Sequence, residues 1–187
     1  AGILASAGLT TKIIGFVYRI PMANILGNTG NGIYSVAFGI YGIVLTLSSY
    51  SMPISVSKLV SEKAAVGSKE DSIKVFRVAM LVSVIVGALA AMGLYFGADG
   101  LAGVYNKTGL EMPLKVLAPT TFIVSVLGCF RGYFQGYGNM VPTALSQIIE
   151  QIINAVVSII AAGQITVLII GSNNEAALRA MGGTMGT

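Results

Sequence analysis

The stretch VAMLVSVIVGALAAMGLYFGA, residues 78–98, contains 21 consecutive residues without a charged side chain. The hydrocarbon core of a bilayer is ~30 Å thick, and a helix needs about 20 apolar residues to cross it. Inside lipid only helices and closed barrels satisfy their backbone polar groups, and this run lacks the alternation of a barrel strand. The stretch therefore predicts a transmembrane helix.

The composition extends this prediction to the whole chain. Of its 187 residues, 55% are hydrophobic and 10% are charged, and the mean hydropathy is +0.83. A soluble domain carries about 25% charged residues, so this chain has too little charge to cover a soluble surface. The net charge of +4 comes mainly from one connection, so membrane topology explains it better than nucleic-acid binding does.

Five hydrophobic segments are predicted to span the membrane. They are residues 3–22, 33–54, 75–97, 114–130 and 142–163, and Pro142 suits the first turn of the last helix. A weaker stretch, residues 165–170, is too short to span. The predicted fold is an all-α polytopic membrane protein with five transmembrane helices and the start of a sixth. The chain begins without Met and ends where another helix starts, so residues 1–187 are expected to be one incomplete helical lobe.

Basic residues are concentrated in the connection between the second and third segments. The first connection, residues 23–32, has no charge, and the third has one Lys against two acidic residues. Positively charged loops face the cytoplasm, so we predict a cytoplasmic N-terminus. The basic connection is interpreted as a solvated face that meets membrane lipid. It holds Lys58, Lys63, Lys69, Lys74 and Arg77.

The first segment carries two cations, Lys12 and Arg19. They are seven residues apart, or two helical turns, so they share one face of the helix. A charge at the centre of a bilayer costs about 2.5–3.5 kcal/mol on insertion scales. We interpret the pair as lining a water-filled pathway suited to an anionic substrate such as a diphosphate. The alternative is that the side chains extend to the membrane interface, which is easier for Arg19 than for Lys12.

The fifth segment carries a polar stripe of Gln147, Gln151, Asn154 and Ser158 at helical spacing. Glu150 lies beside it. A carboxylate inside the membrane is by default a functional residue, so Glu150 is a candidate for Na+ or H+ coupling or for pairing with a buried cation. The alternative places Glu150 at the level of the hydrated headgroups.

Two further positions have weaker interpretations. Pro53, near the end of the second segment, frees a backbone carbonyl and is predicted to bend the helix towards a cavity. Ordinary helix packing explains the small residues around it equally well. Arg131, after the fourth segment, is interpreted first as a topology anchor beside two tyrosines. Contact with lipid headgroups or a diphosphate is the alternative.

The chain offers little for catalysis. It has no His and one cysteine, Cys129, so a disulfide, a Cys/His metal site and a His general base are excluded within it. No nucleophile–base pair and no P-loop motif is present. We therefore expect no enzymatic activity, no cofactor and no metal.

Two stretches resemble a known family. They are GLTTKIIGFVYRIPMANILGNTGNGIYSVAFGIYGIVLTLSSYSMPISVSKLVSEKAA, residues 8–65, and CFRGYFQGYGNMVPTALSQIIEQIINAVV, residues 129–157. Both are similar to the stage V sporulation protein B-like group of polysaccharide biosynthesis flippases, within the multidrug/oligosaccharidyl-lipid/polysaccharide exporter superfamily. The resemblance implies the N-terminal lobe of a two-lobed exporter around a central cavity in the bacterial cytoplasmic membrane.

The resemblance also implies a function in cell-wall synthesis or sporulation. The implied substrate is an undecaprenyl-diphosphate-linked saccharide or peptidoglycan precursor, flipped across the membrane and driven by an ion gradient or the membrane potential. Related flippases have cavity-facing cations in the first helix, which Lys12 matches and Arg19 matches to within one residue. They also place an acid early and an arginine late in the second helix, where this chain has Gly32 and uncharged residues around Ser49.

On this resemblance, the expected substrate-binding residues are Lys12, Arg19, Arg131, Gln147, Gln151 and Asn154. Two alternatives remain open. One is a drug/cation antiporter of the same superfamily, which would need acidic cavity residues. The other is a membrane scaffold for envelope or spore-coat assembly that transports nothing.

Overall fold

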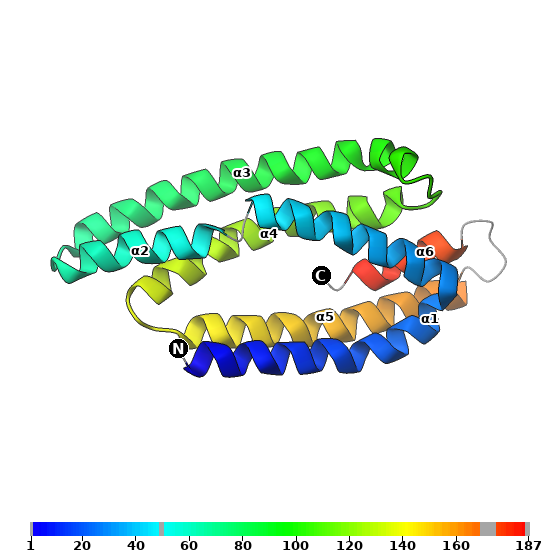
Figure 1. Ribbon diagram of the computed structural model, residues 1–187, viewed down its shortest axis with the longest axis horizontal. Coiled ribbons are helices and arrows are strands. Elements are labelled where there is room, and N and C mark those ends of the chain that lie inside the picture. Colours follow the sequence, from blue (N-terminus) through cyan, green and yellow to red (C-terminus); the bar gives the residue numbers. More distant parts are fainter. Residues whose placement is uncertain (1, 49–50, 169–174, 186–187) are drawn as a thin grey trace.

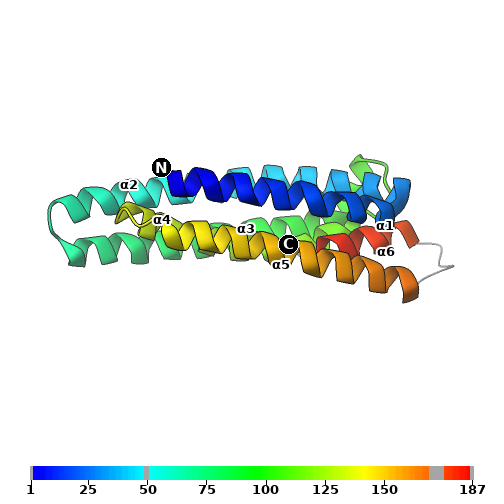
Figure 2. The same ribbon diagram turned by 90° about the horizontal axis from the view of Figure 1, so that it is seen from below.

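The computed structural model describes residues 2–48, 51–168 and 175–185, and every regular element in these ranges is a helix (Figure 1). This confirms the predicted all-α fold. The helices lie alongside one another in an elongated bundle, as Figures 1 and 2 show. Their bounds are α1 (Gly2–Ser48), α2 (Ser51–Ala65), α3 (Lys69–Val104), α4 (Glu111–Gly136), α5 (Val141–Leu168) and α6 (Glu175–Thr184).

Helix α1 contains the first predicted segment and most of the second. It reverses direction at Gly27, so the two segments form two antiparallel arms. Residues 2–26 form the first arm, which runs beside α5, and residues 28–48 form the second arm, which runs back (Figure 1). Gly27 has φ 65° and ψ 179°, a backbone region open essentially to glycine alone. The connection expected over residues 23–32 is therefore corrected: a single non-helical residue replaces it.

Four stretches in the described ranges are long and apolar enough to cross a membrane. One is the run of α1 and α2, and the others are α3, α4 and residues 141–164 of α5. Each arm of α1 exceeds the roughly 20 residues that one crossing needs, so these stretches accommodate the five predicted crossings. The protein is thus a multi-pass helical membrane protein.

Several helices extend beyond their predicted segments. Helix α3 has 36 residues, so at 1.5 Å per residue it is about 54 Å long and projects past the hydrocarbon core. Helix α4 continues to Gly136, which places Arg131 inside the helix and not after it. These ends contain polar residues, and a helix keeps its backbone hydrogen bonds in water as well as in lipid. A hydrophobic segment therefore predicts where a helix crosses the membrane, but it does not predict where that helix ends.

The second predicted segment, residues 33–54, is divided between two helices. Helix α1 ends at Ser48 and α2 begins at Ser51, so Pro53 lies in the first turn of α2, where proline is tolerated. The predicted bend at Pro53 stays a prediction, because Ser49 and Tyr50 lie outside the described residues. The weak stretch 165–170 continues α5 as far as Leu168, and its last two residues also lie outside the described ranges.

The apolar core has two parts at opposite ends of the bundle. The larger part lies near Gly27, where both arms of α1 pack against α3, α4 and α6 through residues such as Leu26, Tyr34 and Leu117. The smaller part joins α2 and α4 through Val56, Val60 and Cys129. The larger part extends as far as Tyr41 and Leu45 of the second arm, so it borders a cavity between the helices.

Helix α2 packs on a glycine face of α4. A Cβ atom placed on Gly132 would lie 2.8 Å from the carbonyl oxygen of Pro53, and one on Gly136 would lie 2.7 Å from Cβ of Val60. The two glycines are four residues apart, the small-xxx-small spacing that lets membrane helices approach closely. This contact holds α4 in a fixed position relative to α2.

Candidate functional site

The first cavity lies between the two arms of α1. It has a volume of about 430 Å³, and Lys12 and Arg19 both line it, as their seven-residue spacing predicts. Because the arms are joined at Gly27, the first arm supplies the cations and the second arm faces them with aromatic and hydroxyl groups. The other lining residues are Gly15, Phe16, Tyr18, Tyr34, Ser35 and Phe38.

A second cavity adjoins the first, because Lys12 lines both. It has a volume of about 380 Å³ and lies among both arms of α1, α4 and α5. Its lining is rich in polar groups from three helices. Besides Lys12, the lining residues are Gly8, Thr11, Tyr41, Leu45, Val124, Arg131, Gln147, Glu150 and Gln151.

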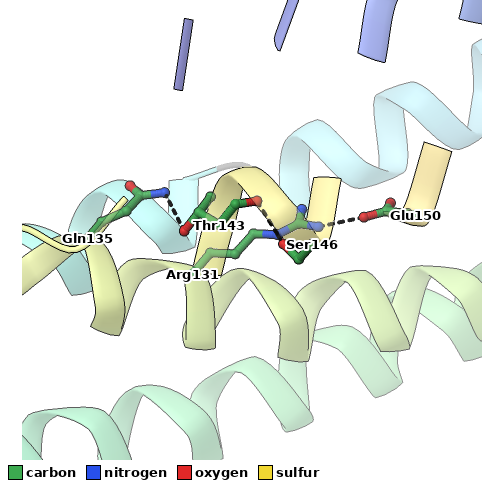
Figure 3. A network of polar contacts seen from close by, with 5 residues as sticks. All are labelled: Arg131, Gln135, Thr143, Ser146 and Glu150. Atoms are coloured by element: carbon green, nitrogen blue, oxygen red, sulfur yellow. Dashed lines mark hydrogen bonds and ion pairs between the residues drawn. The ribbon is translucent and has the colours of Figure 1, made fainter. Parts of the chain in front are cut away.

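A polar network crosses from α4 to α5 at the wall of the second cavity (Figure 3). Arg131 forms an ion pair with Glu150 through Nη2, and its Nε donates a hydrogen bond of 3.0 Å to Oγ of Ser146. Ser146 in turn donates to the backbone oxygen of Thr143 at 2.8 Å. The guanidinium is therefore held at two points, and the interpretation of Arg131 as a topology anchor stays a prediction.

The two partners of this ion pair differ in exposure. The side chain of Arg131 is 15% exposed and that of Glu150 is 44% exposed. A partly buried cation needs a counterion, whereas a half-exposed carboxylate is solvated readily. Arg131 therefore depends on the pair more than Glu150 does.

The polar stripe of α5 divides into residues that line the second cavity and residues that do not. Gln147 and Gln151 line the second cavity, and a Cβ on Gly15 would lie 3.3 Å from Nε2 of Gln151. Asn154 does not line either cavity and accepts a hydrogen bond of 3.1 Å from Oγ of Ser158. The structure thus brings the glutamines, but not Asn154, to the cations.

The cations lining the two cavities outnumber the carboxylates. Lys12, Arg19 and Arg131 contribute three positive charges, and Glu150 contributes one negative charge. Within the described residues no three His, Cys, Asp or Glu side chains form a group that could hold a metal ion. The lining chemistry is suited to an anion and carries hydroxyl, amide and aromatic groups for a polar ligand.

Sequence reasoning did not identify the aromatic wall of the second arm. Tyr34, Phe38 and Tyr41 follow one another at helical spacing, with ring centroids 4.5 Å apart for the first pair and 5.9 Å for the second. Their i, i+4, i+7 pattern was the available signal. It resembles an ordinary core stripe, and only the return of the second arm places it opposite Lys12 and Arg19.

The fold and these cavities define a class: a multi-pass helical membrane protein whose helices surround a cation-lined, amphipathic site. Within that class, the chain belongs to the polysaccharide biosynthesis protein family, whose sequence profile matches residues 1–183.

Three relatives from Bacillus subtilis (strain 168) are similar to the chain. It is 30% identical to stage V sporulation protein B over 152 residues, covering 81% of this chain and 29% of the relative. It is 32% identical to the uncharacterized membrane protein YabM over 157 residues, covering 84% and 29%. It is 30% identical to the lipid II flippase MurJ over 155 residues, covering 78% and 28%. The chain thus matches less than a third of the length of these relatives, and no solved structure gives a significant match.

Proposed function

We propose that the protein containing this chain flips an undecaprenyl-diphosphate-linked saccharide, such as a peptidoglycan precursor, across the bacterial cytoplasmic membrane. It would act as a transporter and not as an enzyme. The family match and the relative named as a lipid II flippase support this class of substrate. The observation that carries the proposal is the position of Lys12, which lines both cavities beside Arg19 and Arg131.

The lining explains how such a substrate would be recognised. A diphosphate diester carries two negative charges, and cations that face a cavity in a membrane protein bind such groups through charge-assisted hydrogen bonds. Gln147 and Gln151 offer amide donors and acceptors to a saccharide, and Tyr34 and Phe38 offer ring faces. In this proposal Lys12, Arg19 and Arg131 bind the diphosphate, and Gln147 and Gln151 form the polar wall.

Complementation tests the proposal. The Lys12→Ala and Arg19→Ala variants are expected to fail to restore growth of a flippase-deficient strain, while the membrane abundance of the protein stays normal. Lys63→Ala removes an exposed cation from α2, outside both cavities, and is the matched control. Normal growth with both cavity variants would refute the proposal.

Two alternatives are separated by direct transport measurement. A drug/cation antiporter needs acidic cavity groups, yet Glu150 is the one carboxylate among the residues lining the two cavities, and it is paired with Arg131. A scaffold for envelope or spore-coat assembly would move nothing. Reconstitution with a labelled lipid-linked saccharide therefore distinguishes a flippase from both.

The orientation and the energy source complete the proposal. The α2–α3 connection, the α4–α5 connection and the N-terminus lie at one end of the bundle (Figures 1 and 2). The basic residues of positions 58–77 belong to that end, so we assign it to the cytoplasm. Val66 is exposed in the α2–α3 connection. We therefore expect Val66→Cys to react with an impermeant maleimide added on the cytoplasmic side and not with one added on the other side. Transport is proposed to draw on a Na+ or H+ gradient, with Glu150 as the coupling candidate.

A further inference from the structure

The ion pair between Arg131 and Glu150 is placed where an anionic ligand would compete with it. Both side chains line the second cavity, together with Lys12 and Tyr41 from the two arms of α1. Arg131 has a second anchor in Ser146, whose Oγ accepts its Nε at 3.0 Å. The guanidinium therefore has a support on α5 that does not involve Glu150.

Burial decides which partner can leave. Arg131 is 15% exposed and Glu150 is 44% exposed. Removing the counterion of a partly buried cation is costly, whereas a half-exposed carboxylate loses little when it turns to solvent. Arg131 must therefore be neutralised by one anion or another, while Glu150 is replaceable.

The number of charges on the ligand decides whether it is favourable for the ligand to replace Glu150 at Arg131. A ligand with one negative charge replaces Glu150 at Arg131 without increasing the number of ion pairs. A ligand with two negative charges neutralises Arg131 and also reaches Lys12, so it gains a charge-assisted contact that the carboxylate does not make. The cavity thereby discriminates by charge number as well as by shape.

We propose that Glu150 is a displaceable counterion: it neutralises Arg131 in the ligand-free protein, and an anionic headgroup has to replace it there, with a net gain when that headgroup is doubly charged. This inference rests on the proposed function, because it assumes that an anionic lipid enters the second cavity. It assigns Glu150 a role in setting the affinity for the substrate, in addition to its candidacy for ion coupling.

The test compares two ligands that differ by one phosphate. The protein containing this chain, in lipid nanodiscs, is titrated with undecaprenyl-diphosphate-linked N-acetylglucosamine and with the corresponding monophosphate-linked lipid, which is a phosphodiester with one negative charge. The unmodified protein is expected to bind the diphosphate lipid about tenfold more tightly, the equivalent of one charge-assisted contact. In Glu150→Gln no ion pair has to be broken for a lipid to reach Arg131, so binding of both lipids is expected to tighten about tenfold while the preference for the diphosphate lipid remains.

Two variants control this result. Asp99→Asn breaks an ion pair of 2.8 Å with Lys115 between α3 and α4, outside both cavities, and should leave both affinities unchanged. Glu150→Asp keeps the negative charge and should leave both affinities unchanged, and this variant also covers the case in which Glu150→Gln fails to fold. Binding that does not tighten in folded Glu150→Gln, or that tightens about tenfold in Glu150→Asp, overturns the inference.

The failures of the two proposals are distinguishable. If the unmodified protein binds neither lipid, the proposed function fails and the inference fails with it. If it binds the diphosphate lipid but Glu150→Gln does not tighten that binding, the inference alone fails.

Discussion

Replacing Gly27 by alanine isolates the backbone requirement of the reversal in α1. Gly27 has φ 65° and ψ 179°, and a Cβ atom added there would meet nothing within 4 Å. The substitution therefore creates no steric clash with neighbouring residues. Any loss of stability must come from forcing an L-residue into a backbone region that it rarely occupies.

The expected cost is about 1–3 kcal/mol, the range for residues held in sparsely populated backbone regions. Gly42→Ala is the matched control, since its added Cβ also meets nothing within 4 Å but its backbone is helical. In the interior of a helix, alanine is favoured over glycine by roughly 0.5–1 kcal/mol. The two Gly→Ala changes are thus expected to shift stability in opposite directions.

Thermal unfolding in detergent measures the difference. With a shift of about 2–4 °C per kcal/mol for a chain of this size, Gly27→Ala should lower Tm and Gly42→Ala should leave it unchanged or raise it. The first cavity depends on the reversal, so Gly27→Ala should also weaken binding of a diphosphate lipid. Equal Tm values for Gly27→Ala and Gly42→Ala would refute the argument that the reversal requires glycine.

Three further predictions concern other contacts. Gly136→Val should lower Tm through overpacking of about 1–3 kcal/mol, because even a Cβ would lie 2.7 Å from Val60; an unchanged Tm would contradict the close α2–α4 contact. Arg131→Met should weaken binding of a diphosphate lipid about tenfold or more, which titration in nanodiscs would show. Asp99→Asn should leave Tm unchanged, because its ion pair with Lys115 is solvent-exposed; a clear fall would contradict this.

The membrane-spanning segments could be predicted because the energetic cost that defines them is local. A charged or polar residue in hydrocarbon is unfavourable wherever the helix packs, so the uncharged run at residues 78–98 predicts a crossing without knowledge of its neighbours. Helix α3 contains the whole run. The helix ends were less predictable, since the backbone of α4 continues through polar residues to Gly136.

Sequence reasoning predicted a connection over residues 23–32 but did not locate the reversal at Gly27. Residues 23–32 contain three glycines, and each is compatible with a turn. Which of them adopts a positive φ depends on how the two arms pack. In the structure Arg179 of α6 donates a hydrogen bond of 3.2 Å to the carbonyl oxygen of Ile25, a contact between residues far apart in the chain.

The candidate site, too, was predictable from the sequence in one part and not in the other. The seven-residue spacing of Lys12 and Arg19 by itself determined that both lie on one helix face, because helical geometry is a local property. Only the tertiary structure decided what that face meets: the aromatic residues of the second arm in one cavity, and Arg131 with Glu150 in the other. The ion pair joins different helices, and its formation depends on how α4 and α5 are rotated against each other. That rotation is set by packing across the whole bundle, so no local pattern in the sequence contains it.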